Sequence, residues 1–323
     1  MKRKNLSLAT FFSIFMLYNV VTLPPLVFYG PFSEIKQMVV GTIVTSRHPQ
    51  FLKLFYSAEK IRQLMRSAGI ERPDIESDGS ILAFNASSDD NLELIDIEDH
   101  SFKGKLLKIK NPKRIKMFTT KDLFKAGEKT SDIARRVGAV AAINGGGFDD
   151  PNGKGNGGFP QGITIHEGKL LTGKTINYPM DIIGIDQNGV LVVGKFTPIQ
   201  LMQDKIMEAV TFGPQIIKSG KRLVRGNGGW GIAPRTVIGQ TKDGTILLLV
   251  IDGRQISSLG ATLKDVQEIM LDYGAINAAN LDGGSSTTMF YKDKVVNSPC
   301  NPFGERYVPT AFVVMPSGKG GGL

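Results

Sequence analysis

The stretch TILLLVIDGRQISSLGATLKDVQEIMLDYGAINAANLDGGSS, residues 245–286, contains the elements that decide the fold. Two short apolar runs, at 245–251 and 275–281, have the length and composition of buried strands. Between them, Thr262 and Asp265 have the spacing of a helix capping box, and an apolar stripe at helical spacing follows before a glycine stop. The stretch therefore predicts a strand, a helix and a second strand in succession.

Short apolar strands joined by turn residues dominate the sequence on either side of this unit. Glycine-containing turns at 186–189, 166–168 and 242–244 predict three β-hairpins, and a further helix is expected at 130–137. Hairpins around one strand–helix–strand unit favour an α+β domain. We therefore expect a mixed, mostly antiparallel sheet with packed helices, preceded by an N-terminal transmembrane helix.

That N-terminal helix is expected because a basic flank precedes a long apolar run. Three basic residues at 2–4 are followed by an uncharged run at 5–33, and residues 6–23 alone supply 18 mostly apolar positions, enough to span a bilayer. The basic flank favours a cytoplasmic N-terminus, which places the rest of the chain outside the cytoplasm. A cleaved signal peptide is the alternative. Because the run has no convincing small-x-small cleavage site, we favour an uncleaved signal anchor that contacts the membrane through residues 5–30.

The chain divides into four predicted segments. After the anchor, residues 51–65 have helical spacing, whereas residues 73–100 are acidic and polar, which is typical of a linker. The segments are 1–33 (basic flank and anchor), 34–100 (membrane-proximal helix and linker), 101–318 (catalytic domain) and 319–323 (flexible tail).

Composition narrows the class of partner. Cys300 is the single cysteine, so an intramolecular disulfide is excluded and the domain depends on its apolar core. The formal charge of +9 suits a position near anionic lipid or wall polymer. Nucleic acid is not expected as a partner, because the topology hides the domain from it and the sequence contains no recognised binding motif.

Asp282 is the leading candidate for a catalytic carboxylate, because it follows an apolar strand and opens a glycine turn. A tight turn in which the aspartate caps its own backbone is the structural alternative. Four apolar strands in the chain end in polar or glycine turns. If those ends converge, one pocket receives Asn144, Arg235, Asp252, Arg254 and Asp282. Two carboxylates with two guanidinium groups suit acid–base or nucleophilic attack on a substrate that carries a phosphate.

Together these motifs resemble the phosphodiester glycosidase family over about residues 105–316. The resemblance implies hydrolysis of the bond between a sugar's anomeric carbon and a phosphodiester oxygen. A phosphate monoester, with a second pKa of about 6, is a good leaving group, so the groups that bind it carry much of the catalysis. The resemblance rests on the order and spacing of seven segments: 144–148 (NGGGF), 213–214 (GP), 234–239 (PRTVIG), 252–254 (DGR), 260–263 (GATL), 280–286 (NLDGGSS) and 306–308 (RYV).

The resemblance also implies roles for individual residues. Asp282 is expected to be the nucleophile or base, with Asp252 as the second carboxylate. The substrate and its phosphate are expected to bind Arg235, Arg254, Arg306, Asn144, Gly145, Gly146, Gly283, Gly284 and Ser285. Phe148 and Trp230 are candidates for stacking on a sugar ring, although an aromatic residue beside glycines is more often a loop anchor. His166, at a predicted hairpin tip, is expected to be structural.

No cofactor is expected. The three histidines have no zinc-like spacing. Oxygen ligands at Asp149, Asp150 and Asn152 are compatible with Ca²⁺, but the pattern is incomplete and the loop contains a lysine, so a solvated loop is favoured.

The expected function is therefore that of a membrane-anchored hydrolase, outside the cytoplasm, that acts on a glycan or glycolipid phosphodiester. A surface glycan, an exopolysaccharide and a wall polymer all fit this substrate class. Two alternatives stay open. One is a non-catalytic module that binds anionic wall polymer, although carboxylates beside a phosphate argue against a pure anion binder. The other is a phosphodiesterase that cleaves the P–O bond.

Overall fold

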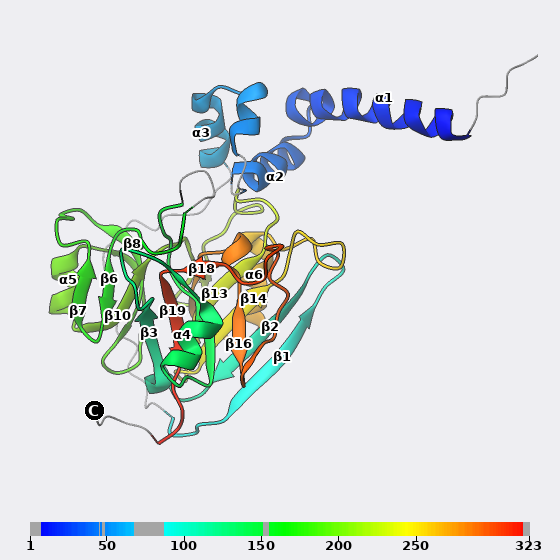
Figure 1. The fold of residues 1–323 in the computed structure, drawn as a ribbon. Helices are drawn as coiled ribbons and strands as arrows, with labels where there is room; N and C mark the ends of the chain where they lie inside the picture. Colours follow the sequence, from blue (N-terminus) through cyan, green and yellow to red (C-terminus); the bar gives the residue numbers. More distant parts are fainter. Residues whose placement is uncertain (1–7, 45, 47–48, 68–86, 151–154, 319–323) are drawn as a thin grey trace, which may run out of the picture.

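The computed structural model describes residues 8–44, 46, 49–67, 87–150 and 155–318. A β-rich domain carries a small group of N-terminal helices at one end, and the first helix projects away from both (Figure 1). The mostly antiparallel α+β architecture predicted from the sequence is confirmed.

A seven-stranded sheet forms the centre of the domain. The predicted strand–helix–strand unit lies here: the strands at 245–251 and 275–281 are β14 and β15, which are both antiparallel to β13 between them. The order across the sheet is β1 (Leu92–Glu98), β2 (Lys103–Ile109), β14 (Ile246–Ile251), β13 (Arg235–Thr241), β15 (Ala275–Leu281), β11 (Gln215–Lys218) and β12 (Lys221–Arg222).

Two five-stranded sheets complete the domain, with a two-stranded sheet of β18 (Tyr307–Val308) and β4 (Glu128–Lys129). All three hairpins predicted from turn residues are present, as β6–β7, β8–β9 and β13–β14. The order across the first five-stranded sheet is β7 (Lys169–Thr172), β6 (Thr164–His166), β10 (Ile206–Thr211), β8 (Met180–Asp186) and β9 (Leu191–Phe196). The order across the second is β17 (Lys294–Val295), β16 (Met289–Tyr291), β5 (Ala141–Asn144), β19 (Thr310–Val314) and β3 (Ile115–Thr119).

The main apolar core lies between these sheets and draws on all three of them. Leu248, Phe312 and Ile183 represent the three sheets in that core, and all are fully buried. The outer faces are covered by helices: α6 (Leu263–Asp272) packs on the seven-stranded sheet, α4 (Thr130–Arg136) on the sheet of β5, and α5 (Pro198–Gln203) on the sheet of β10. Both predicted helices are therefore confirmed, and α6 begins at the capping box of Thr262 and Asp265.

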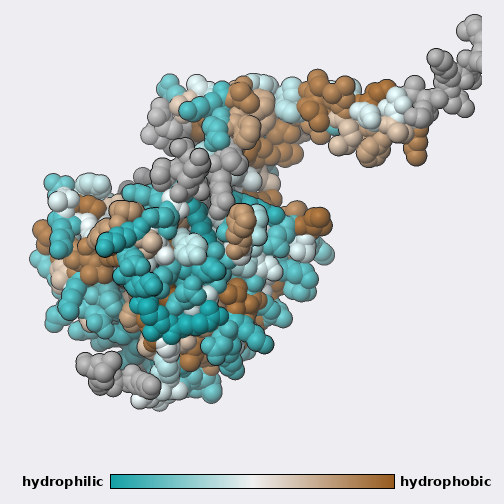
Figure 2. Space-filling model, in the orientation of Figure 1, coloured by the Kyte–Doolittle hydropathy of each residue, from teal (hydrophilic) through white to brown (hydrophobic). Residues whose placement is uncertain are grey.

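The N-terminal group consists of α1 (Leu8–Tyr29), α2 (Ser33–Val44), the 3-10 helix η1 (Pro49–Leu54) and α3 (Ala58–Ser67). Helix α1 is long and apolar enough to cross a membrane, and its apolar side chains are almost entirely exposed (Figure 2). The single helix predicted at 51–65 is wrong. Ser57 accepts a hydrogen bond from the Lys60 N–H and starts α3, so the chain turns between η1 and α3.

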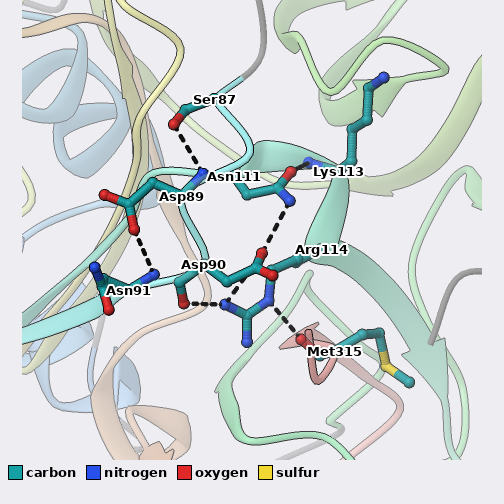
Figure 3. A network of polar contacts seen from close by, with 8 residues as sticks. All are labelled: Ser87, Asp89, Asp90, Asn91, Asn111, Lys113, Arg114 and Met315. Atoms are coloured by element: carbon teal, nitrogen blue, oxygen red, sulfur yellow. Dashed lines mark hydrogen bonds and ion pairs between the residues drawn. The ribbon is translucent and has the colours of Figure 1, made fainter. Parts of the chain in front are cut away.

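The domain begins earlier than the predicted start at residue 101. β1 pairs with β2 along its whole length, so residues 92–98 belong to the sheet and not to a linker. A polar network holds the chain just before β1 (Figure 3). Arg114, at the end of the 3-10 helix η2 (Pro112–Arg114), donates to the carbonyl oxygens of Asp90 and of Met315, the latter at 2.7 Å. This contact ties the start of the domain to its last strand.

Candidate active site

Strand register brings the predicted site segments to one edge of the central sheet. Arg235 at the start of β13 lies opposite Ile251, the last residue of β14, and Thr236 lies opposite Leu281, the last residue of β15. Because β13 is antiparallel to both neighbours, its first residues meet their last residues. The loops that carry Arg254 and Asp282 therefore leave the sheet side by side.

A cavity of about 390 Å³ lies at this edge. Its volume is within the range of small-molecule sites. Its wall contains polar and charged side chains, two aromatic rings and residues of the N-terminal segment. The lining residues are Ser46, Pro49, Gln50, Asp150, Phe212, Trp230, Ala233, Arg235, Arg254, Asn280, Asp282, Gly283, Gly284, Ser285 and Arg306.

Asp282 lies in this wall in a poorly hydrated position. Burial is the main cause that raises its pKa, to about 6, and the nearby Asp150 carboxylate adds to the effect. Ser286, Arg306 and the Gly283 N–H act in the opposite direction. A carboxylate with a pKa near 6 is a stronger base than an ordinary aspartate and is still mostly ionised at neutral pH. The predicted catalytic carboxylate thus has the properties that acid–base chemistry requires.

Asn144 lies beneath Asp282 and not in the cavity wall. The Asn144 side chain is fully buried, its Nδ2 donates to the Asp282 carbonyl oxygen at 2.5 Å, and its Oδ1 accepts from Thr236 Oγ1 at 2.9 Å and from the Thr288 N–H at 3.1 Å. Every one of these bonds fixes main chain or hydroxyl groups around Asp282. Asn144 therefore positions the chain around Asp282 and does not itself line the cavity.

Gly145 and Gly146 also lie beneath the site. The Gly145 carbonyl accepts from the Asp282 N–H at 3.2 Å, while its own N–H donates to the carbonyl of Thr310 at 2.9 Å. A Cβ atom at Gly145 would lie 2.5 Å from the Thr310 hydroxyl, so a side chain has no room there. Gly145 allows a close approach to Thr310 of β19, and Gly146 allows one to Val210 of β10. Gly283, Gly284 and Ser285 line the cavity.

Arg306 is held in the cavity wall by three contacts. Its Nη1 donates to Ser285 Oγ at 3.2 Å, its Nη2 forms an ion pair with Asp150, and its guanidinium lies 4.7 Å from the centroid of the Phe148 ring. Phe148 is buried. It therefore anchors this arginine and is not exposed for stacking on a sugar. A guanidinium fixed in this way is preorganised to bind an oxyanion.

Arg235 and Arg254 differ in how much of each guanidinium can reach a ligand. Arg235 is buried, and its Nε and Nη2 donate to the carbonyls of Ala261 at 3.0 Å and Gly231 at 2.6 Å. Its burial, followed by the charge of Arg254, lowers its pKa to about 9. Arg254 is exposed, with a left-handed φ of 58° and its guanidinium against Gly284. Both arginines line the cavity, and Arg235 also holds the loop at 230–231.

Asp252 does not line this cavity. Its Oδ1 accepts from Asn297 Nδ2 and from the Ser298 N–H, each at 2.9 Å, so the carboxylate braces the loop after β17. Burial raises its pKa, although these two hydrogen bonds counteract the shift. Sequence spacing placed Asp252 correctly at the end of β14 but did not show that its side chain turns to the neighbouring loop. The second carboxylate in the cavity wall is instead Asp150.

Three further residues complete the wall. Trp230 and Phe212 meet edge to face, with ring centroids 6.3 Å apart. Asn280 Nδ2 donates to two main-chain carbonyls, whereas its Oδ1 is buried without a hydrogen-bond partner among the residues that the structure describes. Because this oxygen is buried, Asn280 shapes the wall and does not present the oxygen to a ligand. The sequence predicts Trp230 but neither Phe212 nor Asn280, and the available signal for Asn280 is its position next to the glycine motif.

The remaining sequence predictions concern residues outside the wall. Of the suggested Ca²⁺ ligands, Asn152 lies outside the described residues. Asp149 accepts a hydrogen bond from Gln161 at 3.2 Å, and Asp150 is paired with Arg306. His166 contacts the buried Glu208 carboxylate at 3.0 Å and packs against Phe118, which fits its predicted structural role.

Comparison with known proteins identifies the family of this chain. The phosphodiester glycosidase family profile matches residues 137–315, more than half of the chain, and the match includes Asn144, Arg235, Asp282 and Arg306. The chain belongs to the phosphodiester glycosidase family.

Curated relatives of this chain match it over short stretches. An uncharacterised SPbeta prophage-derived protein of Bacillus subtilis is 36% identical over 83 residues, or 26% of the chain. The N-acetylglucosamine-1-phosphodiester alpha-N-acetylglucosaminidase of Bos taurus is 35% identical over 68 residues, or 21% of the chain. Each match covers only 13% of the relative's own length.

Solved structures share the fold over a larger part of the chain. One is the catalytic domain of zebrafish N-acetylglucosamine-1-phosphodiester alpha-N-acetylglucosaminidase, described as auto-inhibited by its pro-peptide. It superposes with a TM-score of 0.59 at 22% identity, and the match covers 70% of this chain and 82% of the other. A putative exported protein of Burkholderia pseudomallei gives a TM-score of 0.53 at 18% identity, covering 67% and 74%. These likenesses confirm the fold.

Proposed function

We propose that the chain is a membrane-anchored hydrolase whose domain lies outside the cytoplasm and cleaves the C1–O bond of a glycosyl phosphodiester. The observation that carries the proposal is Asp282, a carboxylate with a raised pKa in a cavity that also presents the guanidinium groups of Arg254 and Arg306. The proposed substrate is a glycan or glycolipid phosphodiester, and a surface glycan, an exopolysaccharide and a wall polymer all fit this class.

The arginines suit the leaving group of this reaction. When the C1–O bond breaks, the departing phosphate monoester gains negative charge. Arg306, fixed by Asp150 and Ser285, and Arg254, at the exposed side of the cavity, are placed to receive that charge. Hydrogen-bond donors that already point at the position where charge develops usually make the largest single contribution to transition-state stabilisation. Because a phosphate monoester leaves readily, strong protonation of the leaving oxygen is less necessary than in sugar–sugar hydrolysis.

Asp282 is proposed to act as the nucleophile on C1 or as the base that deprotonates water. Its raised pKa makes it a better base than a solvated aspartate, and Asn144 fixes its main chain. Asp150 replaces Asp252 as the second carboxylate of our proposal, because Asp150 raises the pKa of Asp282 and holds Arg306. Trp230 and Phe212 provide apolar surface for the sugar, and Asn280 is part of the same cavity wall.

A non-catalytic module that binds anionic wall polymer is the alternative, since the arginines alone bind phosphate. The position of Asp282 disfavours it. A half-buried carboxylate beside a phosphate site weakens anion binding, and a pure binder has no use for it. Replacement of Asp282 by asparagine distinguishes the two functions. If the chain is a binding module, the variant binds anionic polymer more tightly; if the chain is an enzyme, the variant loses turnover.

The bond that is cleaved can be identified with water labelled with ¹⁸O. We suggest N-acetylglucosamine 1-phosphate methyl diester as the first substrate, following the name of the bovine relative, with other hexose 1-phosphodiesters in parallel. Attack at C1 places ¹⁸O in the free sugar, whereas attack at phosphorus places it in the phosphate. Mass spectrometry that finds the label in the sugar, with EDTA present, supports the proposal. Label in the phosphate contradicts it.

A further inference from the structure

The N-terminal helices are built into the domain by close backbone contact. A Cβ atom at Gly41 of α2 would lie 2.2 Å from the Gly229 carbonyl oxygen, and one at Gly231 would lie 2.2 Å from the Thr42 nitrogen. Thr42 Oγ1 also accepts from the Ile232 N–H at 3.0 Å. Backbones that approach this closely leave no space for side chains. Helix α2 therefore docks in a defined position on the loop that Arg235 holds from the other side.

The chain that follows α2 forms part of the cavity. Ser46, Pro49 and Gln50 contribute to its wall together with residues of the domain. The segment that connects α1 to the domain is thus a component of the site and not a spacer that keeps the site away from α1.

The same segment returns directly to the end of α1. Leu52 is fully buried in an apolar cluster with Phe28 of α1, and the Phe55 ring stacks on Phe28 with centroids 4.1 Å apart. Gln50 precedes Leu52 by two residues, so their Cα atoms lie within about 7 Å of each other. The cavity wall is therefore next to the last turn of α1. If α1 crosses a bilayer, the cavity lies at the bilayer surface.

Exposed apolar side chains occur on both sides of the cavity. Phe51 and Leu54 lie on η1 beside the wall residue Gln50, and both are exposed. On the domain side, the loop that starts at the wall residue Arg254 carries Ile256, which is fully exposed, and Leu259, which is more than half exposed. The domain surface in view is mainly hydrophilic, with separate brown patches (Figure 2). Exposed apolar groups next to an apolar anchor favour contact with lipid.

We propose that the substrate is a lipid-linked glycosyl phosphodiester held in the membrane, in which a phosphate joins a lipid alcohol to C1 of a sugar. This inference rests on the function proposed above and on α1 as the membrane segment. The lipid chain stays in the bilayer beside Phe51, Leu54, Ile256 and Leu259, while the sugar and phosphate enter the cavity. Water adds to C1 and the C1–O bond breaks, with its electron pair going to the phosphate oxygen. The products are the free sugar, the lipid phosphate monoester and a proton released to solvent through Asp282.

The test compares two substrates with the same sugar and phosphate, using the full chain in nanodiscs. One carries a long prenyl alcohol in the bilayer, and the other carries a methyl group and is soluble. We expect kcat/KM for the prenyl substrate to exceed that for the methyl substrate by at least about tenfold, because insertion of the lipid concentrates it at the cavity. Equal efficiency, or turnover of the methyl substrate alone, overturns the lipid assignment and leaves the proposed hydrolase intact. Turnover of neither substrate overturns both.

Surface variants separate the membrane contact from the chemistry. Paired serine substitutions at Ile256 and Leu259, and separately at Phe51 and Leu54, are expected to reduce the prenyl advantage about three- to tenfold. Turnover of the methyl substrate should change less than about twofold. Ile199→Ser, at an exposed site on the distant helix α5, is the matched control and should alter neither rate. If the paired variants leave the prenyl advantage unchanged, these side chains do not contact lipid and the proposed orientation is wrong.

Discussion

Replacing Asp282 by asparagine should stabilise the domain at neutral pH. Folding raises the pKa of this carboxyl from 3.8 to about 6, so the ionised side chain disfavours the native state. A shift of about two pKa units corresponds to about 3 kcal/mol. The native state binds the extra proton between pH 4 and 6, so wild-type stability falls as pH rises through that window. Asparagine has nearly the same shape and no charge, so it should remove the penalty.

The assay is urea unfolding of the domain at pH 3.5, 5 and 7. We expect the variant to be no more stable than wild type at pH 3.5, and more stable by about 2–3 kcal/mol at pH 7. Asp204→Asn, at an exposed aspartate at the end of α5, is the control and should show no such trend. A stability difference that is constant with pH, or a variant less stable at pH 7, refutes the claim that burial raises this pKa.

Three further predictions follow from contacts around the cavity. Asn144→Ala removes three hydrogen bonds from the chain around Asp282 and should lower the free energy of unfolding by about 3–5 kcal/mol in a urea titration. The exposed Asn188→Ala should lower it by less than about 0.5 kcal/mol. The kcat/KM of wild type should rise with pH to a plateau above about 6, because Asp282 acts in its ionised form; a fall over this range indicates that it acts as an acid instead. Gly41→Val should separate α2 from the loop at 229–232, because a side chain at Gly41 has no room there. We expect faster proteolysis between α1 and β1 and a loss of activity on a membrane substrate. The melting temperature of the β-rich domain should stay unchanged.

Much of the fold follows from local patterns in the sequence. The hairpins were predictable because their turns require glycine with positive φ, as at Gly189, Gly168 and Gly244. Helix α6 was predictable because its capping box and apolar stripe are both local. Arg254 and Asp282 come together because the strands before them end at the same edge, as expected. Arg235 reaches this edge differently, because it is the first residue of β13 and does not follow a strand.

The details of the site depend on contacts that no local pattern encodes. Whether an aspartate at a strand end faces the cavity is set by its neighbours in space, and Asp252 turns to Asn297, which lies 45 residues away in sequence. Asp150 looked like part of a solvated turn, because its partner Arg306 is far along the chain. The segment after α1 was the least predictable part, since Gly41 has a role only when Gly229 and Gly231 lie against it.

The central claim is that Asp282 carries out hydrolysis at C1 of a glycosyl phosphodiester. Its most direct test is the steady-state turnover of such a diester by wild type and by Asp282→Asn, with the urea titration above confirming that the variant is folded. We predict that the variant loses turnover by at least about a thousandfold while it retains or improves substrate binding measured by calorimetry. A folded variant with wild-type turnover contradicts the account.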